Sequence, residues 1–219
     1  MERLWFTGAP GSQWSGIYAQ MQKRLSSIDN SDRESLPTYT TSTGHVSHSG
    51  AYFDPGMQYG NNWDKFTELS KDQILEEIDK PWTGTGTKII KFHELGVYEN
   101  LNHVMTNFPE DSIMIVYKED KASLDWWLRC GGFDITYPDY AWYKDESNML
   151  ERIKIQNQGI LKFAKEKNMP IDISEATDNI NKKHLEFQVS AFIRKQPTSL
   201  PVRLTGVSFK PGSDIIEES

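Results

Sequence analysis

The chain has 219 residues, of which 37% are hydrophobic and 25% charged, a composition typical of a globular protein and not of a disordered chain. The formal net charge of −7 argues against a nucleic-acid partner, because such proteins usually carry a basic patch and a high isoelectric point. The single cysteine, Cys130, excludes an intramolecular disulfide. No apolar run is long enough to predict a membrane span, and the first residues lack a signal-peptide pattern, so a cytoplasmic location is expected.

Short apolar runs and helical periodicity alternate along the chain. Strands are predicted over residues 4–7, 87–92 and 112–117. Helical periodicity begins at Ile17 and recurs over residues 72–78, 97–107, 119–129 and 145–167. This alternation predicts the α/β class, with one domain over residues 1–211 built on a P-loop-like, mostly parallel sheet flanked by helices. Residues 212–219 are polar and acidic and are expected to form a flexible tail.

The segment between the first strand and the first helix reads Gly8-Ala9-Pro10-Gly11-Ser12-Gln13-Trp14-Ser15-Gly16. Parallel sheets bind ligands at the carboxyl ends of their strands, and a helix N-terminus there offers backbone N–H groups to a phosphate. Glycine lets the backbone approach an anion, and Ser12 and Ser15 offer hydroxyl donors. The segment lacks the lysine and the spacing of the G-x-x-x-x-G-K-[ST] motif, so ATP or GTP hydrolysis is poorly supported. A plain strand–helix turn without a ligand stays open.

Three further candidates follow the later strands. His93 ends the strand over 87–92 and has the chemistry of a general base near neutral pH. Lys91 could place a positive charge near an anionic leaving group, and Lys118, after the strand over 112–117, could bind a second phosphate. The alternatives are a histidine that only caps or packs and a lysine at a solvated helix start.

Residues 29–64 are polar and show little periodicity, yet they contain several aromatic rings. Such a stretch is usually functional or mobile, and it is expected to be a lid or an acceptor-binding insert. The residues expected to face an acceptor are His45, His48, Tyr52, Phe53 and Tyr59. The alternative is that the rings belong permanently to the core. No metal site is expected, because the two histidines have no clear third ligand.

Three motifs in this order resemble the sulfotransferase family that uses 3′-phosphoadenylyl sulfate: G-A-P-G-S-Q-W-S, then K-F-H, then V-Y-K-E-D-K-x-S-L. The resemblance extends over roughly residues 3–130 and is greatest to divergent bacterial or virus-encoded members. It implies that His93 is the catalytic base and that Lys91 supports the leaving group. The residues that it implies for donor binding are Pro10, Gly11, Ser12, Gln13, Trp14, Ser15, Lys118, Ser123 and Trp126.

The chain also departs from the family pattern. Gly11 stands where the family has a lysine and Lys118 where it has an arginine, while the usual serine position falls near Trp126, with Ser123 as the nearest hydroxyl. The implied reaction moves a sulfuryl group to a hydroxyl or amine of a small-molecule or glycan acceptor, without a metal, and leaves adenosine 3′,5′-bisphosphate. Two alternatives remain: a P-loop kinase-like phosphotransferase, and a nucleotide-binding module without activity.

Overall fold

The computed structural model describes residues 3–32, 50–135 and 143–169 with their side chains, and the backbone of the short strands at 39–40, 46–48 and 202–205. Four parallel strands form the central sheet in the order β4-β1-β5-β6. Their bounds are β1 Arg3–Gly8, β4 Lys88–Lys91, β5 Ser112–Tyr117 and β6 Val202–Thr205. A separate antiparallel pair consists of β2 (Tyr39–Thr40) and β3 (Val46–His48).

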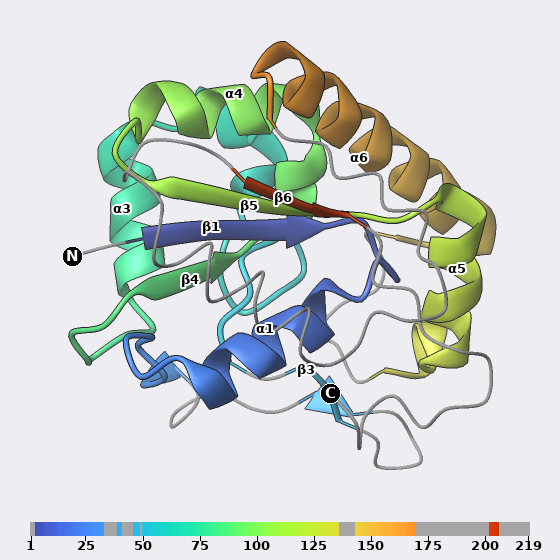
Figure 1. The fold of residues 1–219 in the computed structure, drawn as a ribbon, viewed down its shortest axis with the longest axis horizontal. Helices are drawn as coiled ribbons and strands as arrows, with labels where there is room; N and C mark the ends of the chain where they lie inside the picture. Colours follow the sequence, from blue (N-terminus) through green and yellow to red (C-terminus); the bar gives the residue numbers. More distant parts are fainter. Residues whose placement is uncertain are drawn as a thin grey trace.

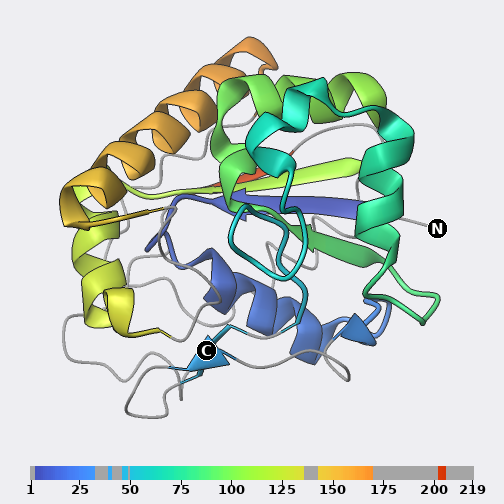
Figure 2. The same cartoon turned by 180° about the vertical axis from the view of Figure 1, so that it is seen from behind.

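Helices cover both faces of this sheet (Figures 1 and 2). The α-helices are α1 Trp14–Arg24, α3 Lys71–Asp79, α4 Tyr98–Asn107, α5 Asp120–Arg129 and α6 Glu146–Glu166. Short 3₁₀ helices occur at η1 Trp63–Glu68, η2 His93–Gly96 and η3 Gly132–Asp134. Side-chain caps fix several starts: Ser70 and Gln73 form a capping box at α3, and Asp145 accepts the Asn148 N–H at α6.

Successive β1 side chains enter different cores, because side chains alternate between the two faces of a strand. Leu4 and Phe6 pack with α1 in one buried cluster. Trp5 packs instead in a larger cluster with residues of α3, α4 and α6. The apolar run of β5 is divided in the same way, with Met114 in the first cluster and Ile115 in the second. Burial on both faces explains why these strands read as continuous apolar runs.

The predicted α/β class, with a mostly parallel sheet flanked by helices, is confirmed. The strands predicted over 4–7, 87–92 and 112–117 and the four later helices agree with the structure to within one residue at each end. The sequence did not predict β6, β2, β3 or η1. The strands β2 and β3 have only two and three residues, too few to establish a period.

The described part of the 29–64 segment contributes to the core. Tyr52 and Phe53 are completely buried, and each forms an isolated β-bridge, Tyr52 with Lys91 and Phe53 with Tyr59. Both rings are therefore part of the core in this structure, as the alternative to a lid or insert predicts. His45 and residues 212–219 lie outside the described residues, and His48 is described only by its backbone in β3. No helix in the described part of the chain is long and apolar enough to span a membrane.

Candidate functional site

The carboxyl ends of β4, β1 and β5 lie at one edge of the sheet, where the chain turns toward η2, α1 and α5 (Figure 1). Because these strands are parallel neighbours, the segments after Lys91, Gly8 and Tyr117 meet there. The candidate site is therefore assembled from three separate parts of the sequence.

The β1–α1 loop turns tightly into its helix. The Ser12 N–H donates to the Ala9 carbonyl over 2.9 Å, and Gln13, the residue before α1, has a left-handed backbone with φ of 68°. The Gln13 carbonyl accepts the N–H groups of Gly16 and Ile17, which begin the helical ladder. The first turn of α1 contains no acidic side chain. The positive end of the helix dipole therefore faces the loop without a neutralising carboxylate in that turn, which suits an anion.

Ser12 is the hydroxyl of this loop that most suits a ligand. The residue is 2% exposed, and its Oγ has no hydrogen-bond partner among the described residues. The Oγ lies against Gly8, where a Cβ would come within 2.4 Å of it, so a side chain at that position would displace the hydroxyl. A buried hydroxyl without a partner is costly unless another group satisfies it. A phosphate oxygen bound in the loop would do so, and the loop therefore fits a phosphorylated donor.

His93 begins η2 and is held by Asp54. The His93 N–H donates to Asp54 Oδ2 over 2.9 Å, and the Nδ1 atom of His93 forms a hydrogen bond with the same oxygen. The other Asp54 oxygen, Oδ1, accepts the Glu94 N–H over 3.1 Å, and the Thr7 hydroxyl donates to the His93 carbonyl over 3.2 Å. The site therefore fixes both the backbone and the ring of His93.

Aromatic rings surround the imidazole of His93. Ring centroids lie 4.9 Å away for Trp14, 5.4 Å for Tyr52 and 6.4 Å for Tyr143. Trp14 is the first residue of α1, so the candidate base lies beside the helix start that forms the candidate phosphate site. Of the residues expected to face an acceptor, Tyr52 reaches His93, while Phe53 and Tyr59 pack against each other in a different cluster.

Lys91 is completely buried next to this group. Its ammonium lies 4.0 Å from the ring centroids of both Tyr18 and Tyr52, a geometry that stabilises a cation by cation–π attraction. Tyr18 follows Trp14 by one turn of α1. The structure therefore buries the Lys91 ammonium against the first two turns of α1.

The third part of the site is the start of α5. The Lys118 ammonium lies 4.9 Å from the ring centroid of Trp126, and burial lowers the pKa of Lys118. Ser123 is fully buried, and its hydroxyl donates to the Lys118 carbonyl over 3.1 Å. The backbone carbonyl of Ser123 also contacts Gly11 of the β1–α1 loop. The backbone of Ser123 therefore packs against the loop, while its hydroxyl is bonded within α5 and its preceding turn.

Sequence reasoning missed Asp54 and Glu94. Glu94 follows His93 and is 5% exposed; burial and the nearby Asp54 carboxylate raise its pKa. Gln156 of α6 donates to Glu94 over 2.9 Å, and the Arg152 guanidinium lies 3.6 Å from it. No motif connects Asp54 to His93, because the two residues are 39 positions apart.

Among the described residues, no three His, Cys, Asp or Glu side chains are placed to hold a metal ion.

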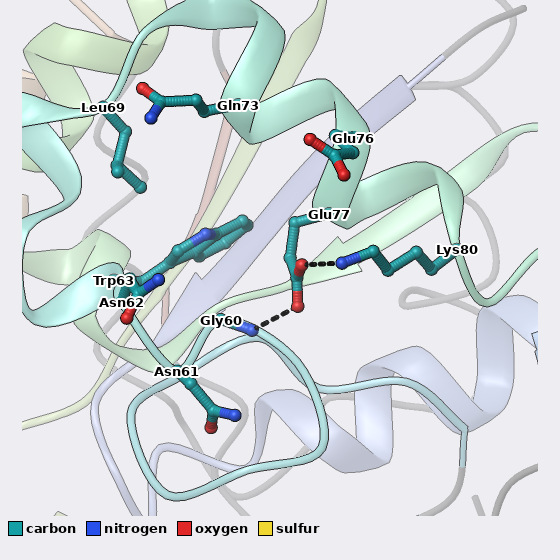
Figure 3. Close-up of a pocket in the computed structure, with 9 residues that line it drawn as sticks. All are labelled: Gly60, Asn61, Asn62, Trp63, Leu69, Gln73, Glu76, Glu77 and Lys80. Carbon is teal, nitrogen blue, oxygen red and sulfur yellow. Dashed lines mark hydrogen bonds and ion pairs between the residues drawn. The ribbon is translucent and has the colours of Figure 1, made fainter.

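A polar pocket of about 400 Å³ opens between α3 and the segment over 60–63. Figure 3 shows Glu77 at its wall, where the carboxylate accepts the Gly60 N–H and pairs with Lys80. No residue of the β1–α1 loop lines this pocket. The turn over 54–60 links the pocket to the candidate site, because it runs from Asp54, which contacts His93, to Gly60, which lines the pocket. In this turn the Asp54 N–H donates to the Tyr59 carbonyl over 3.0 Å.

The sequence matches no family model and no curated protein. Among solved structures, the chain is similar to a shikimate kinase from Bacteroides thetaiotaomicron, with 11% identity, a TM-score of 0.43, and coverage of 88% of this chain and 97% of that one. It is also similar to a deoxyadenosine kinase from M. mycoides with products dCMP and dCDP bound, with 14% identity, a TM-score of 0.42, and coverage of 88% and 100%. Similarity at this level defines neither a family nor an activity.

Proposed function

We propose that this chain is a nucleotide-dependent transferase in which the β1–α1 loop binds a phosphate of the donor and His93 is the general base. The observation that carries the proposal is the contact between His93 and Trp14. It places a histidine beside the first turn of the helix whose N-terminus would bind the donor. A transferase needs these two features together, because the acceptor must be deprotonated where the donor's reactive group is held.

The donor end of the site is supported by the backbone and by Ser12. Backbone N–H groups at the start of α1 and the buried Ser12 hydroxyl would donate to phosphate oxygens. The Lys91 cation lies under the same helix, where it would stabilise negative charge that develops on the leaving phosphate.

The specific reaction that we propose is sulfuryl transfer from 3′-phosphoadenylyl sulfate. The acceptor oxygen or nitrogen forms a bond to sulfur, the bond between sulfur and the phosphate oxygen breaks, and His93 takes the acceptor proton. The products are the sulfated acceptor and adenosine 3′,5′-bisphosphate. The resemblance of the three sequence motifs supports this choice.

Phosphoryl transfer from ATP is a second candidate, favoured by one observation. The Ser123 hydroxyl, which the resemblance assigns to the 3′-phosphate, is buried and bonded to the Lys118 carbonyl. Lys118 would then be the main ligand left for a 3′-phosphate, a group that ATP lacks.

A donor-consumption assay separates the candidates. The protein is incubated with 3′-phosphoadenylyl sulfate, or with ATP and Mg²⁺, and a mixture of phenols, amines and oligosaccharides as acceptors. Sulfuryl transfer predicts release of adenosine 3′,5′-bisphosphate, reduced about 10²–10⁴-fold in His93→Gln. Consumption of ATP alone would establish the second candidate. Binding of the bisphosphate without any turnover would leave a nucleotide-binding module.

A further inference from the structure

The Asp54 carboxylate forms three hydrogen bonds with His93 and Glu94 at the candidate site. It accepts the backbone N–H groups of His93 and Glu94 and also bonds to Nδ1 of His93. The Asp54 side chain is 1% exposed and the His93 side chain 6% exposed. Water therefore does not compete freely for these hydrogen bonds, and the carboxylate has a fixed position relative to the ring.

This arrangement determines which ring nitrogen of His93 carries the proton when the imidazole is neutral. A carboxylate can only accept hydrogen bonds, so its partner Nδ1 must be the donor. The Nε2 atom is then the basic nitrogen. General-base catalysis requires an unprotonated ring nitrogen, and a carboxylate bonded to Nδ1 leaves Nε2 in that state.

The chain contains an internal contrast in His103. Its Nε2 atom lies 3.1 Å from the Leu69 carbonyl, and the side-chain amide of Asn107 faces its Nδ1. A carbonyl also only accepts, so neutral His103 must carry its proton on Nε2. The two histidines are therefore expected to be opposite tautomers in the same molecule.

We propose that Asp54 is a positioning residue that holds His93 as the Nδ1–H tautomer and so makes Nε2 the base of the transfer. The catalytic part of this inference rests on the proposed function. The tautomer part does not, because it follows from the hydrogen bonds alone. Asp54 is also fixed from the other side, since its backbone forms the turn with Tyr59 and its carbonyl accepts the Met57 N–H over 3.0 Å.

Long-range ¹H–¹⁵N correlation spectra of the full chain test the tautomers at neutral pH. The expected result is Nδ1–H for His93 and Nε2–H for His103, with His93 losing this preference in Asp54→Asn. His103 should be unchanged in that variant. An Nε2–H tautomer of His93 in the unmodified protein would overturn the proposal, even if Asp54→Asn does not fold.

Kinetics test the catalytic part, with Asp32→Asn as the matched control. Asp32 is another fully buried aspartate that accepts a backbone N–H, from Ala51. We expect Asp54→Asn to lower kcat by about 10²-fold or more while the KM for the donor changes little. Asp32→Asn should keep the kcat of the unmodified protein. Equal losses in the two variants would mean that Asp54 has only a structural role, whereas absence of turnover in every form, with the tautomers as expected, would instead contradict the proposed function.

Discussion

Gly11 in the β1–α1 loop lies against the backbone carbonyl of Ser123 in α5, so that a Cβ on Gly11 would come within 1.8 Å of that oxygen. Gly11 also has a φ of +76°, which L side chains rarely adopt. These two facts explain why the loop has no lysine at this position, where the sulfotransferase pattern has one. The loop and α5 are packed too closely for any side chain.

Replacing Gly11 by alanine should therefore destabilise the protein. Backbone strain costs about 1–3 kcal/mol, and the contact with the Ser123 carbonyl adds to it because a backbone atom cannot move aside easily. Urea unfolding measures the change. The control is Gly16→Ala: a Cβ there meets nothing within 4 Å, and alanine inside α1 should raise stability by about 0.5–1 kcal/mol. A Gly11→Ala variant as stable as the unmodified protein would contradict the tight packing of loop and helix.

Ser12→Ala should separate stability from binding. Removing a buried hydroxyl that has no partner removes a desolvation cost, so the midpoint of thermal unfolding should stay the same or rise. Affinity for adenosine 3′,5′-bisphosphate should fall by roughly 10- to 100-fold, because a hydrogen bond to a charged group contributes about 1.5–3 kcal/mol. Calorimetric titration and a melting curve on the same sample make the comparison. A lower melting midpoint with unchanged affinity would indicate a purely structural hydroxyl.

Lys118→Ala should weaken binding of adenosine 3′,5′-bisphosphate by roughly 10- to 100-fold. Adenosine 5′-phosphosulfate, which lacks the 3′-phosphate, should bind the variant and the unmodified protein equally. Because burial lowers the pKa of Lys118, affinity for the bisphosphate should also decline with rising pH before ordinary lysines lose their charge. Lys121→Ala, on the exposed side of α5, is the matched control. Equal losses for the two nucleotides would remove Lys118 from the 3′-phosphate site.

Glu94 should make stability depend on pH. Burial, and then the Asp54 carboxylate, raise the pKa of Glu94 above its ordinary value of 4.5. At pH values between the ordinary pKa of Glu94 in the unfolded chain and its raised pKa in the folded protein, the folded state binds more protons than the unfolded state. Stability therefore falls as pH rises through this window. Glu94→Gln should lack this fall and gain stability relative to the unmodified protein above the window. Urea unfolding between about pH 4 and pH 8 measures both curves; the exposed Glu99→Gln on α4 should follow the unmodified protein. Parallel curves for Glu94→Gln and the unmodified protein would rule out this titration.

The features that could be predicted from the sequence are those encoded locally. The strand–loop–helix at Gly8 to Ser15 and the strand that ends in Lys91-Phe92-His93 depend on neighbouring residues, and parallel pairing then brings them to one edge. The partner of His93 could not be predicted, because Asp54 reaches it only through the tertiary fold. The burial of Tyr52 and Phe53 was one of two alternatives that the sequence left open, since their polar surroundings in the sequence resemble those of a loop.

The distance between Gly11 and Ser123 illustrates a second limit. The sequence shows that the family lysine is absent but not why, because the reason is a contact between segments 112 positions apart. The buried, internally bonded Ser123 hydroxyl is likewise a consequence of how α5 packs on the loop. Motif comparison assigns residue types to positions, and only packing decides which atoms remain available for a ligand.

The most direct test of the central claim is to map, by backbone amide chemical shifts, where adenosine 3′,5′-bisphosphate binds. We expect the largest changes at Gly8 to Ser15, with smaller changes at His93 and Lys118, and no saturable change around the pocket between Gly60 and Lys80. The same titration with Mg²⁺ and ATP shows whether the loop prefers a nucleotide with a 3′-phosphate. Saturable changes confined to residues outside the β1–α1 loop, or none with either nucleotide, would contradict the assignment of this loop as the donor site.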